Sequence, residues 1–269
     1  MLRIALPNKG SLSQAASDML RESGYRQRGD SKELTLTDAE NGVEFFYLRP
    51  RDIALYVGEG TLDLGVTGRD LLRDSGAKAE EVLELGFGTS RFHFAGPQGR
   101  FATVEDLAGQ RIATSYTGIV STYLEQRGIE ATVTRLDGAV ESSIQLGVAD
   151  AIADVEVFGE PILTSEAVLV SRSGADLPAG FEVFKRRLEG VLVARSYVMM
   201  DYDIPTTQVE AASALTPGIE SPTVAPLQRE GWVAVRAMVP RKGAQRLMDD
   251  LFELGARGIL LTDIHACRL

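Results

Sequence analysis

Short, mainly apolar runs alternate with amphipathic segments along the first two thirds of the chain, and this alternation limits the fold more than any other feature. Residues 2–6, 62–66 and 111–114 are such runs, and each is followed by turn residues and then by a helical pattern. Strands that alternate with helices build largely parallel sheets covered by helices. The pattern therefore predicts an α/β fold for this part of the chain.

The alternation breaks near Gly88 and the chain returns near residues 168–171, which predicts two lobes with a cleft between them. This arrangement resembles that of periplasmic solute-binding proteins, although enzymes share it. From a strand over residues 191–200 onwards the order is βαββαβ, which predicts a ferredoxin-like regulatory domain. We expect lobe I at residues 1–88 and 172–190, lobe II at residues 89–171 and the regulatory domain at residues 191–269.

The amino-acid composition limits the kinds of molecule that the protein is expected to bind. The 269 residues include 28 basic and 38 acidic side chains, and the net charge of −10 argues against nucleic-acid or membrane-surface binding without excluding a local phosphate pocket. No run approaches the roughly eighteen apolar residues of a membrane-spanning helix, and the N-terminal residues lack the apolar core of a signal peptide. The single cysteine, Cys267, lies in the last predicted strand, where we expect a buried reduced thiol. We therefore expect a cytoplasmic protein.

Basic residues follow three of the predicted strands of the first lobe. Lys9, Arg49 and Arg69 each stand just beyond a strand end, and in an open α/β sheet ligands bind beyond the carboxyl ends of the strands. Lys9 also precedes Gly10 and Ser11 at a predicted helix N-terminus, whose free N–H groups suit an anion. The pattern indicates a phosphate site. The alternative for Lys9 is an ordinary solvated lysine.

A second group of candidate residues lies in residues 136–155. A turn leads into a predicted helix over residues 140–148, whose apolar residues are four apart, and then into a short strand over residues 151–153. That strand would deliver Asp154 to the mouth of the cleft. The alternative is that Asp150 and Asp154 only solvate the two ends of the strand.

Nine stretches, spread over nearly the whole chain, carry a resemblance to a known family. They are MLRIALPNKGSLS, VEFFYLRPRDIALYVGEG, LDLGVTGRDLL, ELGFGTSRF, RLDGAVESSIQLGVADAIADV, FGEP, MMDYDIP, TPGIESPTVAPL and DIHACRL. In order and spacing they closely resemble ATP phosphoribosyltransferase of histidine biosynthesis. The resemblance is to the long form of that family, which carries a C-terminal regulatory domain, and most of all to its actinobacterial members.

The resemblance implies a reaction in which ATP and phosphoribosyl pyrophosphate (PRPP) give N1-(5-phosphoribosyl)-ATP and pyrophosphate. It also implies Mg2+, which we expect to enter with the pyrophosphate rather than in a dedicated protein site. The main tasks are to bring two polyanions together and to stabilise the leaving pyrophosphate. The catalytic candidates are Asp154, Lys9 and Arg49, and the substrate-binding candidates are Gly10, Ser11, Gly68, Arg69, Asp70, Asp137, Glu141, Asp150 and Val155.

One segment departs from the family pattern. In the family, the strand equivalent to the one ending at Asp154 runs into a Gly/Ser/Thr-rich loop that cradles the 5-phosphate of PRPP, whereas here Val155 is followed directly by Glu156 and Val157. Roughly a dozen residues are missing, a size typical of a functional loop. Either the protein lacks this loop and binds PRPP poorly, or the present sequence omits a segment that the protein carries. We favour the second, because mobile phosphate loops order only around a ligand.

The resemblance also implies feedback inhibition by histidine, at a site in the last domain that includes Asp203, Ser221 and Thr223. On the residues alone, Asp203 is more typical of a turn and Thr223 of an ordinary strand position, and only the resemblance favours a ligand site. His93 and His265 are isolated, and we expect them to be structural.

Two other functions are compatible with the sequence. A two-lobed, non-catalytic ligand-binding or sensor protein would have the same cleft, but the missing export signal and the phosphate-suited residues disfavour it. A catalytically dead paralogue that assembles with a partner is supported only by the missing loop. The resemblance further implies a homo-oligomer, from dimer to hexamer.

Overall fold

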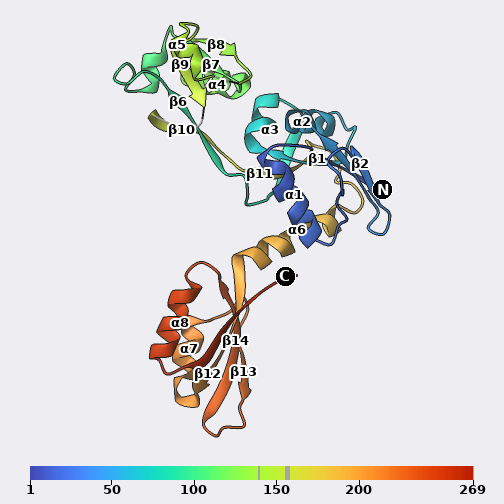
Figure 1. The fold of residues 1–269 in the computed structure, drawn as a ribbon, viewed down its shortest axis with the longest axis vertical. Coiled ribbons are helices and arrows are strands. Elements are labelled where there is room, and N and C mark those ends of the chain that lie inside the picture. Colours follow the sequence, from blue (N-terminus) through green and yellow to red (C-terminus); the bar gives the residue numbers. More distant parts are fainter. Residues whose placement is uncertain (139, 155–157, 269) are drawn as a thin grey trace. The chain divides into compact units, whose positions relative to one another are not determined.

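The computed structural model describes residues 1–138, 140–154 and 158–268. The chain divides into two compact units, Met1–Arg21 with Tyr25–Glu182 and Glu22–Gly24 with Val183–Leu269. Figure 1 labels their helices and strands. Within the described residues, no helix combines the length and apolar character needed to cross a membrane.

The first sheet, in lobe I, has the strand order β2-β3-β1-β4-β11-β5. β1 pairs in parallel with β3 and β4, whereas β2 and β11 run antiparallel to their neighbours. The strands are β1 (Leu2–Pro7), β2 (Thr35–Asp38), β3 (Val43–Leu48), β4 (Leu64–Gly68), β5 (Ala79–Glu84) and β11 (Ala167–Arg172), and the helices are α1 (Ser11–Glu22), α2 (Pro50–Gly58) and α3 (Arg69–Ser75).

Local sequence explains most of this lobe. α1 begins at Ser11, as predicted, and β2 and β3 form a hairpin in which Gly42 has a φ of 67°, a conformation that glycine adopts readily. The apolar face of α2, with Ile53 and Val57, packs against the buried strand β11 at Val168. Because the apolar residues of α2 recur at helical spacing, they form one face, and this face determines which side of the helix packs on the sheet.

The second sheet, in lobe II, has the order β10-β6-β9-β7-β8. β7 pairs in parallel with β8 and β9, while β6 runs antiparallel to β9 and β10. The strands are β6 (Ser90–Ala95), β7 (Arg111–Thr114), β8 (Thr132–Arg135), β9 (Ala151–Asp154) and β10 (Phe158–Ser165), and the helices are η1 (Val104–Leu107), α4 (Thr117–Glu125) and α5 (Ser142–Gln145).

The boundary between the lobes differs from the expected one. The expected lobe II extends through residue 171, but β11 (Ala167–Arg172) pairs with β4 and β5 in the sheet of lobe I. The first five residues of β11 are buried, and a strand that is buried on both faces needs a neighbour on each side. Lobe II therefore ends before Ala167.

The C-terminal sheet has the order β13-β14-β12-β15, with every pair antiparallel. This is the predicted ferredoxin-like order, and both α7 and α8 pack on one face of the sheet (Figure 1). The elements are α6 (Phe181–Ser196), β12 (Tyr197–Pro205), η2 (Thr206–Gln208), α7 (Val209–Leu215), β13 (Thr223–Pro226), β14 (Trp232–Pro240), α8 (Ala244–Glu253) and β15 (Arg257–Asp263).

Two predictions at the edges of this domain are wrong. The strand expected from Val191 begins only at Tyr197, because Leu188, Val191 and Ala194 continue the buried face of α6 at helical spacing. The last strand ends at Asp263, short of Cys267, so the thiol is only partly buried.

Gly65 is the position where α2 presses most closely on β4. A β-carbon at Gly65 would overlap the methyl carbons of Ile53 and Val57. We predict that Gly65→Ala lowers the free energy of unfolding by about 1–3 kcal/mol through overpacking, measured by chemical denaturation. Gly29→Ala is the matched control, because nothing lies within 4 Å of a β-carbon there. Equal stability of the two variants would contradict the packing described for α2.

Candidate functional site

The carboxyl ends of three parallel strands meet at one edge of the lobe I sheet. Pro7 at the end of β1 is in register with Leu48 at the end of β3, and β4 runs parallel to β1 on its other side. Lys9, Arg49 and Arg69 follow these three strands, so the fold places their backbones at the same edge. That juxtaposition is the one predicted from their positions in the sequence.

Lys9 and Arg49 are available to a ligand. Both residues are exposed, and neither forms an ion pair within residues 1–138, 140–154 and 158–268. Gly10 turns the chain with a φ of 83°, and α1 starts at Ser11. The first N–H groups of a helix lack intrahelical partners and attract anions. This corner therefore combines a free ammonium with free backbone donors.

Arg69 differs from the prediction. The sequence analysis names Arg69 as a substrate-binding candidate at a strand end, but its side chain is only 15% exposed and contacts three carboxylates. Nε lies 2.9 Å from Glu81, Nη2 2.6 Å from Glu84 and Nη1 3.5 Å from Glu166. Burial opposes the charge, but the hydrogen bond to Glu81 and the three carboxylates outweigh it and raise the pKa of Arg69. Three carboxylates of this acidic chain thus pair with the Arg69 guanidinium inside the protein.

Gly68 and Asp70 also face inward. Gly68 is a substrate-binding candidate, but a β-carbon there would meet the carboxylate of Asp70, which fills the space beside the glycine. The Asp70 N–H donates to Ser165 Oγ at 2.9 Å, and Ser165 Oγ in turn donates to Asp70 Oδ1 at 2.9 Å. These contacts tie the start of α3 to the end of β10.

Lobe II has a carboxyl edge of its own, formed by β7, β8 and β9. Asp154 ends β9, beside His93 of β6, and Asp137 lies two residues beyond the end of β8. Asp137 is exposed and its carboxylate lies 3.4 Å from Arg135. Val155, also predicted to bind substrate, lies outside the described residues.

Asp150 lies at the opposite end of β9 from Asp154. Its carboxylate is 2.9 Å from Nε of Arg111, at the start of β7, and 3.0 Å from Nη2 of Arg100. Hydrogen bonds from Arg111 hold the pKa of Asp150 well below its usual range. The structure therefore does not bring Asp150 together with the other predicted site residues.

The helix predicted over residues 140–148 is much shorter than expected. α5 covers only Ser142–Gln145, with exposed Glu141 at its N-cap. Gly147, with a φ of 69°, stands just after the helix, and Val148 is 46% exposed instead of lining a buried face. A glycine in the left-handed region ends a helix, so the four-residue spacing alone does not make one.

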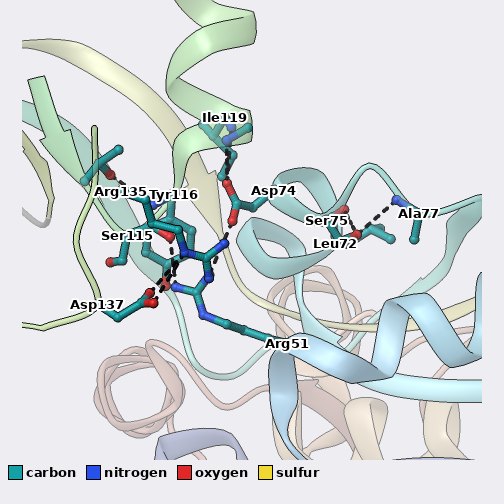
Figure 2. A network of polar contacts seen from close by, with 12 residues as sticks. Arg51, Leu72, Asp74, Ser75, Ala77, Ser115, Tyr116, Ile119, Arg135 and Asp137 are labelled. Carbon is teal, nitrogen blue, oxygen red and sulfur yellow. Dashed lines mark hydrogen bonds and ion pairs between the residues drawn. The ribbon is translucent and has the colours of Figure 1, made fainter. Parts of the chain in front are cut away.

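The lobes also touch through side chains that sequence reasoning missed. Arg51 of α2 lies 3.3 Å from Asp74 of α3, and its Nη2 donates to the carbonyl of Ser115 at 3.0 Å. Figure 2 shows this guanidinium between Asp74 and the backbone of lobe II. We call the contacts of Arg51 and Asp74 with residues 115–119 the interlobe bridge. A pocket of about 270 Å³ lies beside it, lined in part by Asp52 and Arg135.

The predicted histidine-site residues lie in the C-terminal domain. Asp203 is opposite Ala234 of β14, and Thr223 is opposite Arg236, two positions along the same strand. Residues opposite each other in a sheet, and those two apart, share a face. Asp203 and Thr223 thus share the face opposite the one that packs on α7 and α8, and exposed Ser221 precedes β13.

The two histidines are in separate places. His93 is half-buried in β6 and His265 is exposed after β15. Among the residues that the structure describes, no group of three or more His, Cys, Asp or Glu side chains is placed to hold a metal ion.

The fold defines a class of protein: a two-lobed α/β unit with charged residues at its strand ends, joined to a ferredoxin-like domain. The chain is similar in fold to an ATP phosphoribosyl transferase (HisG:HisZ) complex from Thermotoga maritima, with a TM-score of 0.60, 24% identity, and coverage of 70% of this chain and 97% of that chain. This likeness supports the two-lobed fold alone.

Sequence comparison gives the family. Residues 49–189 match the family model described as ATP phosphoribosyltransferase, and residues 194–266 match the one described as HisG, C-terminal domain. Proteins named ATP phosphoribosyltransferase from Arthrobacter sp. (strain FB24) and Streptomyces coelicolor are 61% and 62% identical, with 100% of this chain and of each relative covered. The chain belongs to the ATP phosphoribosyltransferase family and is therefore a pentosyltransferase.

These alignments bear on the segment predicted to be missing. They run over 281 to 286 positions, whereas this chain has 269 residues, so at least twelve positions in each have no residue here. β9 and β10 both run antiparallel to β6, on its two sides, and are therefore parallel to each other. Only three residues separate Asp154 from Phe158, whereas parallel strands are usually joined by a dozen or more. The alignment lengths indicate that residues are missing, and the short link between the two parallel strands favours this place for them.

We predict that the protein expressed from its gene has an intact mass above 29.1 kDa, the mass of the present sequence, because it carries the missing connection. Mass spectrometry of the intact chain, with sequencing of the gene across Val155 and Glu156, measures this directly. A mass of 29.1 kDa would show that the protein itself lacks the segment.

Proposed function

We propose that this chain transfers the 5-phosphoribosyl group of PRPP to N1 of ATP and releases pyrophosphate, the first step of histidine biosynthesis. The observation that carries the proposal is 60–62% identity, over the full length, to proteins named ATP phosphoribosyltransferase. The family match favours this enzyme over a non-catalytic ligand-binding protein.

The residues of lobe I suit the electrostatic part of the task. Two polyanions repel each other, so an enzyme that joins them must supply positive charge and hold both in a reactive geometry. Exposed Lys9 and Arg49, with the N–H groups at Gly10 and Ser11, offer that charge at one strand edge. We assign phosphate binding to these four residues. Arg69 acts within the protein, through its three carboxylate partners.

The residues of lobe II suit the ribose and the metal. Asp154 ends β9, Asp137 lies two residues beyond β8 and Glu141 is the N-cap of α5. A carboxylate accepts hydrogen bonds from ribose hydroxyls. The spread-out positions of these three residues fit Mg2+ held mainly by substrate phosphates with one or two carboxylates. When bound, the metal would neutralise charge on the leaving pyrophosphate.

Lys9→Ala tests the phosphate assignment. Because a charge-assisted contact would be lost, we predict that KM for a phosphorylated substrate rises about tenfold, equivalent to about 1.4 kcal/mol. The measurement is the initial rate of phosphoribosyl-ATP formation, by absorbance, with ATP, PRPP and Mg2+ and with the segment after Val155 verified. Lys32→Ala is the matched control, since Lys32 is also exposed. An unchanged KM for both substrates would remove Lys9 from the site.

We further propose that histidine inhibits the enzyme by binding to the open face of the C-terminal sheet. Asp203 supplies a carboxylate for the cationic amino group of histidine, and Ser221 and Thr223 supply hydroxyl groups. The sharing of one sheet face by Asp203 and Thr223 supports this assignment.

Asp203→Ala is expected to leave turnover without histidine largely unchanged and to raise the histidine concentration needed for half-inhibition about tenfold or more, because an ion pair is lost. Inhibition curves at fixed substrate concentrations measure the effect. Asp249→Ala, which removes an exposed carboxylate from α8, serves as the control. Equal inhibition of the Asp203→Ala variant and the wild type would refute the site.

We also propose that the protein forms a homo-oligomer, from dimer to hexamer. The family match and the open face of the C-terminal sheet support association of identical chains. We also propose a cytoplasmic location, where ATP and PRPP are available.

A further inference from the structure

The N-terminus of α4 in lobe II is capped by a side chain from lobe I. Oδ1 of Asp74, in α3, accepts hydrogen bonds from the N–H groups of Gly118 at 2.8 Å and Ile119 at 3.4 Å. The N-cap residue of α4 itself, Tyr116, makes no capping bond with its side chain. Since the first N–H groups of a helix have no intrahelical acceptor, Asp74 takes the place of the missing cap.

The second oxygen of Asp74 extends the contact to Arg51. Oδ2 lies 3.3 Å from Arg51 Nη1, while Nη2 of the same guanidinium donates to Ser115 and its carbon lies 5.0 Å from the ring centre of Tyr116. The Asp74 side chain is only 8% exposed. Loss of a buried carboxylate with these partners leaves N–H groups and a cation without their acceptor, which is costly.

The close approach of α3 to α4 depends on the small size of Gly118. A β-carbon at Gly118 would stand 2.6 Å from the backbone oxygen of Asp74, closer than real contacts allow. Gly118 does not have the positive φ that would require glycine. The approach of α3 to α4 therefore accounts for the glycine, and any larger residue would push the two helices apart.

The interlobe bridge stands between the two candidate strand edges. Arg51 lies two residues beyond Arg49, at the carboxyl edge of lobe I, and Ser115 follows the end of β7, at the carboxyl edge of lobe II. We propose that Asp74 is a positioning residue: by capping α4 across the lobes and holding Arg51, it fixes the separation at which substrates bound to the two edges react. The proposal rests on the proposed function, because it assumes one substrate on each edge.

A distance measurement tests the positioning without any need for turnover. Spin labels on Lys78→Cys in lobe I and Glu125→Cys in lobe II, in a Cys267→Ser background diluted with unlabelled protein, report the interlobe distance by pulsed electron paramagnetic resonance. We expect one narrow distribution for the otherwise unchanged protein, and a broader or longer one for Asp74→Ala. Gly118→Ala should give the same change although every polar group remains, so loss of the Asp74 carboxylate would not explain it.

Kinetics then connect the distance to the reaction. We expect Asp74→Ala and Gly118→Ala each to lower kcat about 10–100-fold while KM for each substrate changes less than about threefold, because misplacement of reactants slows the joining step. The double variant should lose little more than either single one. Asp74→Asn keeps an acceptor for α4 and should recover part of kcat. Asp18→Ala, which removes a carboxylate whose partners Gln14 and Arg21 both belong to α1, and Gly29→Ala are the controls.

The two measurements separate the possible failures. Wild-type distance distributions in both Asp74→Ala and Gly118→Ala would overturn the positioning role, whatever their rates. Altered distances with an unchanged kcat would also overturn it, because the separation would not matter to the reaction. If the wild-type protein forms no phosphoribosyl-ATP while the distances change as expected, the proposed function fails and the interlobe bridge stands as a structural contact.

Discussion

Parallel pairing of short buried strands is the constraint on which the rest of the structure depends. Because β1, β3 and β4 run in one direction, the residues that follow them emerge at one edge, and β7, β8 and β9 do the same in lobe II. Lys9 and Asp154 are 145 residues apart in sequence, and each lies at the edge where parallel strands of its own sheet end. The proposed reaction requires two substrates to meet, and in our proposal each edge holds one of them.

The basic residues at the strand ends of this acidic chain occupy two kinds of environment that the sequence does not distinguish. Lys9 and Arg49 are exposed at the strand ends, whereas Arg69 joins three carboxylates from β5 and from the connection between β10 and β11. A carboxylate partner lowers the free-energy cost of burying a guanidinium. An arginine can therefore be buried where several carboxylates surround it. The position of Arg69 was predictable from the sequence; its partners were not.

The connection between β9 and β10 is shorter than the fold leads one to expect. β9 and β10 are parallel strands on opposite sides of β6, and only three residues connect them, whereas such a connection usually takes about a dozen or more. The chain is also at least twelve residues shorter than its alignments with relatives. The resemblance implies that the missing segment is a phosphate-binding loop. The alignment lengths show that relatives have residues that this chain lacks, and the geometry of the sheet points to the connection after Asp154 as their place.

The sequence by itself determined the local features. The alternation of apolar runs and helical segments, the hairpin at Gly42, the start of α1 at Ser11 and the βαββαβ order all depend on neighbouring residues and on short-range periodicity. The nine quoted stretches likewise identified the family without any coordinates. The tertiary structure decided what depends on distant partners: the place of β11 in the first sheet, the shortening of α5 at Gly147, the pairing of Asp150 with Arg111 and the capping of α4 by Asp74. A hydrogen bond or an ion pair between residues far apart in the chain leaves no periodic trace in the sequence, because it is fixed only when the packed sheets bring its two ends together.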